Sequence, residues 1–407
     1  MPEILQKNWV YAFGLIGPLA FFSVYALWLP ILIIVLCNVP RLVTVIRAEG
    51  TASLKRYLAY FIVPAFGALS ALWALIPADA VSTAAKFAGY ICVAILAGLV
   101  IRHAADSEKR KIVFSTTIGL LIAFPVALLD VSLSGAIWDL YKSYEFNPNV
   151  YSRGTAITAC LLFPLAVGLF RYTAAWQSIV FILICLGMIF GLYMEAAKLA
   201  VILGGVFFVL VRWQRKLFWP VVLLPLVIAF VFPVFFTTPL TEQQQCRLHY
   251  TMDSAYHRVM IYQFSTHKII EKPIVGWGMD SSRSIPGGAS KVGTINCIRP
   301  DGQPTKLNIG GNLPLHPHNA SVQIWLELGL IGTLLLSASV LILIRRFERN
   351  NSDNQGRAII AATFCSICLI YNISFGLWQS WLMFTMILLG CIVIALQRSS
   401  AASEQQQ

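Results

Sequence analysis

Long apolar runs, separated by short polar stretches, make up most of this chain. A membrane-spanning helix needs roughly 20 mostly apolar residues. The first run has no signal-peptide cleavage site after it, so we expect this run to stay as a span. Pro30 and Pro40 interrupt the second run. The pattern predicts twelve spans, at residues 9–25, 27–45, 57–77, 84–103, 112–129, 154–171, 175–193, 197–212, 218–236, 319–344, 358–376 and 379–397.

One hydrophilic segment, residues 237–318, separates nine predicted spans in residues 1–236 from three in residues 319–397. Apolar residues recur at helical spacing in residues 251–273, where Asp253 could cap a helix lying at the membrane surface. A loop rich in Gly, Pro and Ser follows at residues 274–315. Residues 398–407 are polar and predict a disordered cytoplasmic tail.

Composition agrees with a chain whose main solvent is the bilayer. Hydrophobic residues make up 58% of the chain and charged residues only 12%, whereas a soluble domain is about a quarter charged. The sequence therefore predicts an all-α polytopic membrane protein, with no convincing internal repeat.

Membrane topology explains the net charge of +12 better than nucleic-acid binding does. If the N-terminus is inside, alternate loops collect 18 of the 30 basic residues and 7 acidic ones, which places +11 on one face. Such an excess of Lys and Arg marks the cytoplasmic side of a membrane protein. We therefore predict that both termini are cytoplasmic, that residues 237–318 face the periplasm of a bacterial cell, and that nucleic acid is not a partner.

The nine cysteines divide along the same line. Seven lie in apolar runs and are expected to be small buried hydrophobic residues, including the Cys365-x-x-Cys368 pair. Cys246 and Cys297 both lie in the hydrophilic segment, which is predicted to be in an oxidising compartment. We expect these two residues to form a disulfide.

Three basic residues on the outer side are not explained by topology: Arg153, Lys198 and Arg258. Cations at membrane depth usually face a cavity or a partner, although Lys and Arg can also extend to the interface. Glu195, three residues before Lys198, offers that lysine a helical partner as another explanation. Together the three cations could bind a doubly charged anion such as a pyrophosphate.

Two histidines, His316 and His318, stand directly before an apolar helical run. Pro317 disfavours helix at residue 316, and Asn319 can cap the helix that follows. His318 thus precedes the first turn, where the helix dipole favours the neutral imidazole and so a general base. Hydrogen bonding to a loop carbonyl explains His318 equally well. A zinc site lacks a third ligand, and we find no motif for a metal or other cofactor.

His318-Asn319, followed by nine residues and Gly329, resembles the signature of the O-antigen ligase and polymerase superfamily. Arg258 and the later Pro273-x-x-Gly276-x-Gly278 turn add to the resemblance, which covers essentially the whole chain. It implies about a dozen spans in a GT-C-like fold, with one large periplasmic segment between the ninth and tenth.

The resemblance also implies roles for these residues. His318 would deprotonate the acceptor hydroxyl with support from His316 and Asn319, and Arg153 and Arg258 would bind the pyrophosphate. Lys198 occupies a place where the family often has Arg, so its charge is kept but the bidentate fork is lost.

The implied activity is that of a lipopolysaccharide O-antigen ligase in the bacterial inner membrane. Such an enzyme transfers a glycan from undecaprenyl-pyrophosphate to lipid A–core, without metal and with inversion at the anomeric carbon. The alternatives are an O-antigen polymerase within the same superfamily, a protein O-oligosaccharyltransferase, and a transporter. Transporters usually have repeated halves, which this sequence lacks.

Overall fold

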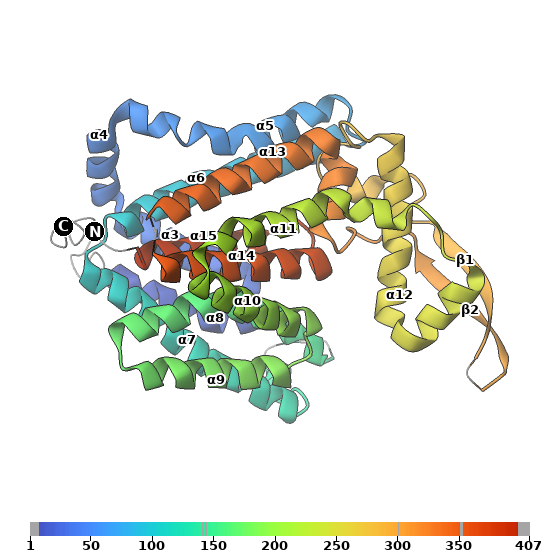
Figure 1. The fold of residues 1–407 in the computed structure, drawn as a ribbon, viewed down its shortest axis with the longest axis horizontal. Helices are drawn as coiled ribbons and strands as arrows, with labels where there is room; N and C mark the ends of the chain where they lie inside the picture. The colour runs from blue at the N-terminus through green and yellow to red at the C-terminus, as the bar shows by residue number, and fades with distance from the viewer. Residues whose placement is uncertain (1–7, 141, 143–144, 300, 351–352, 398–407) are drawn as a thin grey trace.

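The computed structural model describes residues 8–140, 142, 145–299, 301–350 and 353–397. Most helices run side by side in a bundle, with α12 and a β-hairpin at one end (Figure 1). The beginning of η1 and the end of α15 lie at the other end, on the left of Figure 1. We call these the α12 end and the termini end.

The bundle helices are α2 (Ile16–Phe22), α3 (Trp28–Cys37), α4 (Val39–Lys55), α5 (Ile62–Leu69), α6 (Pro77–Arg102), α7 (Asp106–Ser132), α8 (Ser152–Tyr172), α9 (Ala175–Gly191), α10 (Glu195–Trp213), α11 (Phe218–Val231), α13 (Ala320–Asn350), α14 (Asn354–Ile373) and α15 (Ser380–Ala395). Short 3-10 helices join or extend them: η1 (Trp9–Leu15), η2 (Val24–Leu27), η3 (Leu58–Phe61), η4 (Ser70–Leu72), η5 (Trp138–Leu140), η6 (Pro148–Tyr151), η7 (Arg215–Leu217), η8 (Phe232–Phe236) and η9 (Ser281–Ser284). The remaining elements are α12 (Glu242–Glu271), β1 (Lys291–Ile298) and β2 (Pro304–Gly311).

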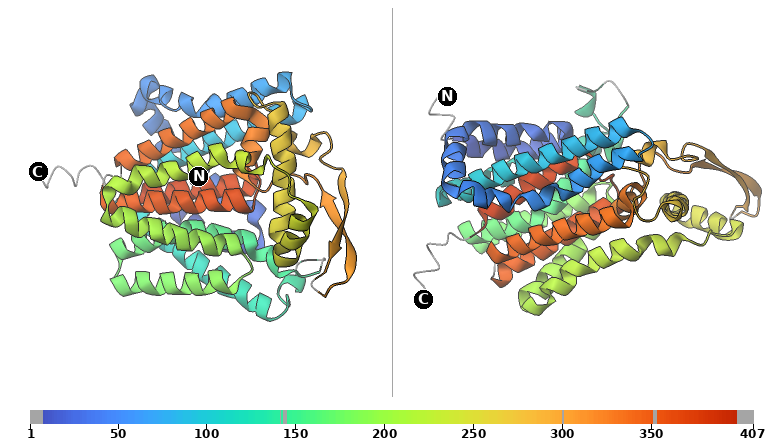
Figure 2. Two further views of the ribbon diagram at one scale, coloured as in Figure 1. Left: turned by 45° about the vertical axis from the view of Figure 1, so that its right-hand side comes forward. Right: turned by 90° about the horizontal axis from the view of Figure 1, so that it is seen from above.

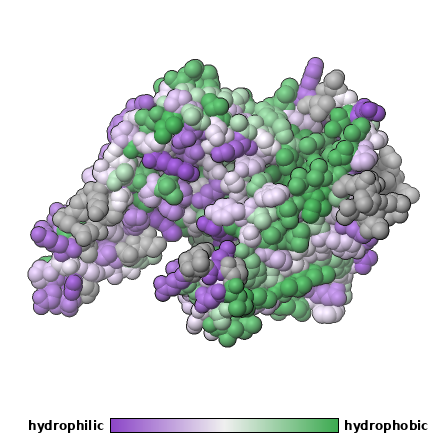
Figure 3. All heavy atoms as spheres, turned by 180° about the vertical axis from the view of Figure 1, so that it is seen from behind, coloured by the Kyte–Doolittle hydropathy of each residue, from purple (hydrophilic) through white to green (hydrophobic). Residues whose placement is uncertain are grey.

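The architecture is that of an all-α polytopic membrane protein. Among the described residues, seven helices are long and apolar enough to cross a membrane, or eight if one bent pair counts as a span. Four shorter apolar helices coincide in sequence with other predicted spans: Trp9–Phe22, Leu58–Leu72, Ala175–Gly191 and Ser380–Ala395. Each of the twelve predicted segments thus has a helical counterpart, but the count of twelve spans stays a prediction. Seen from behind, hydrophobic residues gather over the bundle, and hydrophilic residues over the projecting α12 end (Figure 3).

The second predicted span is bent. The helices Val24–Cys37 and Val39–Gly50 meet at an angle of 68°. The bend falls at Asn38, between the two prolines that interrupt this run in the sequence, and the Asn38 side-chain amide donates to the carbonyl of Ile34. A polar side chain at the bend thus satisfies a carbonyl that the next turn would otherwise have bonded.

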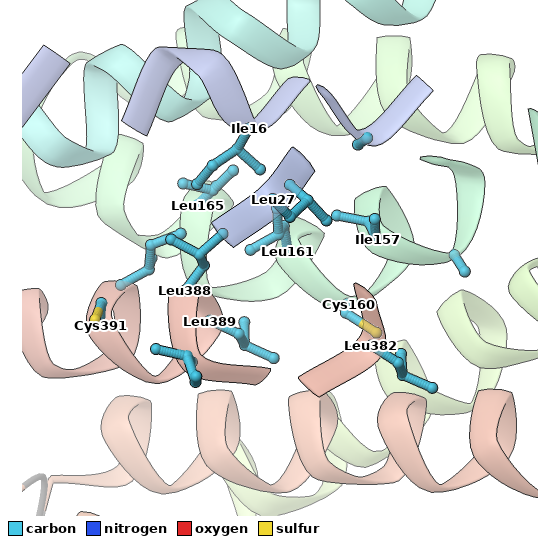
Figure 4. Packing of buried hydrophobic residues seen from close by; sticks show 14 of the residues in the cluster. Ile16, Leu27, Ile157, Cys160, Leu161, Leu165, Leu382, Leu388, Leu389 and Cys391 are labelled. Carbon is cyan, nitrogen blue, oxygen red and sulfur yellow. The ribbon is translucent and has the colours of Figure 1, made fainter. Parts of the chain in front are cut away.

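Helix α8 is the centre of the bundle. Within its span, 83% of the apolar window is buried. Leu161 and Leu165 of α8 pack with Ile16, Leu27 and Leu388, which come from α2, η2 and α15 (Figure 4). The amino- and carboxyl-terminal parts of the chain therefore meet around one helix and form one continuous core.

Helix α12 lies across the end of the bundle (Figures 1 and 2). The sequence predicted a helix only from residue 251, but α12 begins at Glu242 and has a non-helical break at Met252. Thr241 starts it early, because its hydroxyl accepts from the Gln244 N–H while the Gln244 side chain accepts from the Thr241 N–H. The predicted cap at Asp253 follows the break, and its side chain lies outside the described residues.

The loop predicted at residues 274–315 contains a β-hairpin that sequence analysis missed. Strands β1 and β2 pair antiparallel, with Lys291 opposite Gly311 and Ile298 opposite Pro304. The Pro-Asp-Gly sequence at residues 300–302 is a turn signal between two stretches with β-branched residues, and Gly302 takes the required positive φ of 83°. The expected disulfide joins Cys246 of α12 to Cys297 of β1, with Cα atoms 5.6 Å apart.

Helix α13 is broken at Gly329, where the turn at residues 273–278 docks. Gly329 has φ 62° and ψ −159°, a conformation that essentially only glycine adopts. The N–H groups of Leu330 and Ile331 donate to the carbonyls of Pro273 and Ile274. In return, the N–H groups of Trp277 and Gly278 donate to the carbonyls of Leu326 and Glu327. We call residues 273–278 the docked turn.

The contact leaves no room for side chains at its centre. A Cβ added at Gly329 would lie 2.5 Å from the carbonyl carbon of Ile274, and one added at Gly276 would lie 2.4 Å from that of Glu327. Both glycines also have positive φ. The two glycine motifs noted in the sequence are therefore the two sides of one backbone contact.

We expect Gly329→Ala to lower the free energy of unfolding by at least about 2 kcal/mol, because the substitution combines backbone strain with a clash against backbone atoms. The melting temperature of the detergent-purified protein measures the effect. Gly205→Ala in α10 is the matched control, since nothing lies within 4 Å of its added Cβ. Equal melting temperatures for the two variants would contradict the proposed role of this contact.

Candidate active site

His318 stands at the α12 end, two residues before α13 begins, and its φ is 55°. Non-glycine residues rarely adopt this left-handed conformation, and where they do it is often at a functional site. The ring nitrogen Nδ1 lies 3.1 Å from the carbonyl oxygen of Ser374. A carbonyl can only accept, so Nδ1 carries the hydrogen and Nε2 keeps its lone pair. The hydrogen bond that offered an alternative explanation of His318 thus also sets the tautomer that a general base requires.

His316 packs beside His318, with ring centroids 4.3 Å apart. The backbone N–H of His318 donates to Nδ1 of His316 at 3.1 Å. On the other side, the side-chain amide of Gln379 lies 3.1 Å from Nε2 of His316. Gly376 leaves room for this ring, because a Cβ there would lie 2.8 Å from it. His316 therefore holds the backbone of His318 in place.

Both imidazoles are neutral near pH 7. Burial, the neighbouring His318 and the Arg283 guanidinium lower the pKa of His316 to about 4. Burial also lowers the pKa of His318 below its usual 6.5, as do the charges of Arg258 and His257, against the opposite effect of the bond to Ser374. The Nε2 atom of His318 is thus available as a proton acceptor at neutral pH.

Asn319 caps α13, as the sequence predicted. Its side-chain oxygen accepts from the N–H of Val322 at 2.9 Å, and its amide donates to the carbonyl of Asn372 at 3.0 Å. The Asn372 side chain in turn accepts from both the N–H and the hydroxyl of Ser321. The start of α13 is therefore tied to the end of α14, close to the Ser374 carbonyl that orients His318.

The fully buried carboxylate of Glu327, two turns into α13, holds the surrounding loops together. One oxygen accepts from the Ser282 hydroxyl at 2.5 Å and the Gln323 amide at 2.9 Å. The other accepts from the Asp280 N–H at 2.8 Å and the Trp378 indole at 2.6 Å. One carboxylate thus joins α13 to the segment after the docked turn and to the α14–α15 loop.

Two further contacts extend this network. The Asp280 carboxylate accepts from the hydroxyl of Thr83 on α6 at 2.7 Å. The side-chain oxygen of Gln323 accepts from the N–H of Leu377 at 2.7 Å. The segment after the docked turn and the α14–α15 loop are therefore fastened directly to α13, and α6 is joined to them through Asp280.

Two arginines act electrostatically on the histidine pair. Arg258 lies on α12, and its charge lowers the pKa of His318. Arg283 lies in η9 and lowers the pKa of His316, with its own side chain 3.9 Å from the Asp280 carboxylate. Tyr262, one turn after Arg258, is buried, and burial raises its pKa, so it stays a neutral hydroxyl. The site therefore combines a neutral base with positive charge.

Comparisons with known proteins relate part of the chain to a known family. Residues 179–337 match the family model described as O-antigen ligase. Over these residues the chain is similar to the O-antigen ligase family, and its curated relatives point to the same superfamily. The matched region contains His318, Arg258, Lys198 and Glu327, whereas Arg153 precedes it.

Curated relatives carry the name "Putative polysaccharide ligase". A protein of Rickettsia conorii is 29% identical over 300 residues, which cover 72% of this chain and 68% of that protein. A Rickettsia prowazekii protein is 27% identical over 66% of this chain and 63% of its own length. A Rickettsia felis protein is 26% identical over 77% of this chain and 74% of its own. The matches thus span about two thirds of the relatives' length.

Arg153 and Lys198, the other two cations singled out in the sequence, also lie at the α12 end. They contact different residues. Arg153, in the first turn of α8, places its guanidinium 5.2 Å from the centroid of the Tyr25 ring. Lys198, in the first turn of α10, donates to Glu195 at 2.7 Å, which is the helical pair considered from the sequence. The two helix starts are near each other, because the Ser152 hydroxyl contacts the carbonyl of Tyr193. No described contact joins Arg153 or Lys198 to His318.

Sequence analysis missed the supporting residues of this site. The sequence analysis did not single out Glu327 or Arg283. Ser374, Trp378 and Gln379 gave no signal, because their partners lie more than 50 residues away along the chain. Among the described residues, no group of three or more His, Cys, Asp and Glu side chains is placed to share a metal ion.

We expect Glu327→Gln to lower the free energy of unfolding by about 2 kcal/mol or more, since its amide group would face two of the four buried donors. The melting temperature in detergent measures this loss. Glu195→Gln is the control, because it makes the same change at a side chain that is 84% exposed, and its effect should stay within about 0.5 kcal/mol. Wild-type stability of Glu327→Gln would show that the network does not hold the site.

Proposed function

We propose that this protein is a lipopolysaccharide O-antigen ligase, which transfers a glycan from undecaprenyl-pyrophosphate to lipid A–core. The observation that carries the proposal is the state of His318, a neutral imidazole with Nδ1 held by the Ser374 carbonyl and Nε2 left as an acceptor. The match of residues 179–337 to the O-antigen ligase family supports the reaction class. A neutral base beside arginines suits an attack by a hydroxyl on a carbon that carries a phosphate leaving group.

The proposed reaction is a single displacement. Nε2 of His318 takes the proton from the acceptor hydroxyl, whose oxygen forms the new bond to the anomeric carbon. The bond from that carbon to the pyrophosphate oxygen breaks on the opposite side, so the configuration inverts and the carrier leaves as undecaprenyl pyrophosphate. Arginine forks can offset the charge on the departing phosphates without a metal or other cofactor.

The cations divide this work by position. Arg258 and Arg283 act on the histidine pair and are assigned to the pyrophosphate next to the reacting carbon. Arg153 and Lys198 are assigned to the carrier farther from the base. The Glu195 partner of Lys198 is 84% exposed, so a phosphate can replace that ion pair at little cost.

The charge pattern supports an orientation for the chain. The basic loops lie at the termini end, which we assign to the cytoplasm of a bacterium. The α12 end, with His318 and the disulfide between Cys246 and Cys297, is assigned to the oxidising periplasm. The protein would then act in the inner membrane, where carrier, acceptor and surrounding lipids all reach the site from the bilayer.

We expect His318→Ala to abolish transfer in a purified system that contains carrier-linked glycan and lipid A–core, while binding of the carrier persists. General base catalysis contributes about 100- to 10,000-fold, so the residual rate should be lower by at least that range. Gel analysis of the glycan products measures transfer. His267→Ala on the exposed side of α12 is the control and should act like wild type.

The products and the pH profile test the proposal further. Longer glycan on the carrier, with a bare core, would identify a polymerase instead of a ligase. The lowered pKa of His318 keeps the base neutral at pH 7, so the rate should stay level there and fall only as the pH drops below about 6.5. A wild-type rate in His318→Ala would refute the assignment of the base.

We expect Arg258→Lys to raise the KM for the carrier-linked glycan by about 10-fold, because lysine keeps the charge but loses a bidentate phosphate contact. Initial rates at varied donor concentration measure this change. Arg247→Lys is the control, since Arg247 lies on α12 before the break at Met252, away from His318. An unchanged KM would assign Arg258 to the solvated surface.

A further inference from the structure

A cavity of about 490 Å³ lies at the termini end, far from His318. Five arginines line it: Arg56, Arg102, Arg345, Arg346 and Arg349. Arg102 ends α6, whose first turns reach the α12 end through Thr83, so most of a 26-residue helix separates this cavity from the candidate active site. Neither the proposed reaction nor the docked turn uses these side chains.

The arginines converge from three parts of the fold. Arg56 follows α4, Arg102 is the last residue of α6, and three arginines lie in the last two turns of α13. Arg345 and Arg349 are four residues apart and so share one face of α13. The negative ends of the α6 and α13 dipoles favour a nearby cation each, but their half-charges do not balance five arginines.

The described lining of the cavity contains no carboxylate. The acidic residues on neighbouring parts of α4 and α13 have other partners: Glu49 lies 3.7 Å from His103, and Glu348 lies 2.9 Å from Arg357. Cations gathered around one space repel one another, and an anion between them turns that repulsion into attraction.

The rule that places positive charge in the cytoplasm does not explain the geometry. Lys and Arg satisfy that rule equally well, yet every cation in the lining is Arg, whose planar fork matches phosphate oxygens. Arg346 is also held in place, because it donates to the Tyr57 hydroxyl at 2.7 Å and lies 4.4 Å from that ring's centroid. Tyr60 and Asn350 add neutral hydrogen-bonding groups to the lining.

Apolar surface continues from the cavity along the bundle. Ile342 belongs to the lining and is 45% exposed. On the other side, Leu58 and Ile62 flank Tyr60 and are also exposed. Acyl chains require this kind of surface next to the phosphate site, whereas a soluble phosphate does not.

We propose that this cavity binds the headgroup of an acidic phospholipid, whose phosphate lies among the arginines and whose acyl chains lie along α13 and the Leu58–Ile62 stretch. Basic pockets between membrane helices on the cytoplasmic side suit lipids such as phosphatidylglycerol and cardiolipin. Binding there would join the ends of α6 and α13 to the segment between α4 and α5.

Native mass spectrometry of the full chain can test the proposal after incubation with vesicles of phosphatidylethanolamine, phosphatidylglycerol and cardiolipin in equal amounts. The wild type should retain the two acidic lipids over phosphatidylethanolamine. The variant Arg345→Gln with Arg349→Gln should retain them about 10- to 30-fold less, since each basic residue near such a headgroup contributes about one kcal/mol. Both side chains are exposed, so the fold should tolerate the change.

The control variant, Arg215→Gln with Lys216→Gln, removes the same charge from exposed positions in η7, outside the cavity. It should retain acidic lipid like the wild type. Equal losses of acidic lipid in the two variants would show that retention depends only on general surface charge, which would overturn the proposal. Displacement of the lipid by millimolar inorganic phosphate would also overturn it, because the ligand would then be a soluble anion.

Discussion

The geometry of the candidate site depends on the docked turn, whose backbone fills the break that Gly329 makes in α13. A broken helix at membrane depth leaves N–H and C=O groups that water cannot reach, and each one left unsatisfied costs free energy. The turn at residues 273–278 satisfies four of them through backbone hydrogen bonds. The break can therefore exist only where the chain returns from the α12 end, so two segments about 50 residues apart are specified together.

The break also explains the spacing between the base and Gly329. Residues 320–328 form a short helix between them, and this helix with its cap Asn319 carries Asn319, Gln323 and Glu327 along one side. Each of these side chains bonds the stretch from Asn372 to Trp378. Three side chains along α13 thus hold the loop whose Ser374 carbonyl orients His318. A base held by a rigid support keeps its tautomer and its position, which is what proton transfer requires.

Features that depend on residues close together in the sequence could be predicted from it. The membrane class, the helical segments and the Asn319 cap follow from apolar length and from hydrogen-bonding groups within four residues. The pairing of Cys246 with Cys297 follows from compartment chemistry and needs no geometry. The role of Glu327 could not be predicted, because three of its four donors come from 45 to 51 residues away. The contact of Arg153 with the Tyr25 ring could not be predicted for the same reason.

The positive charge around His318 has two opposite consequences for the proposed reaction. Without a donor, Arg258 and His257 help to lower the pKa of His318, so the base is neutral but weak. A pyrophosphate bound between Arg258 and Arg283 would offset that charge and raise the proton affinity of Nε2. The base would thus become stronger only once the leaving group is in place. The same cations then stabilise the charge that leaves with the carrier, so one electrostatic arrangement serves both halves of the displacement.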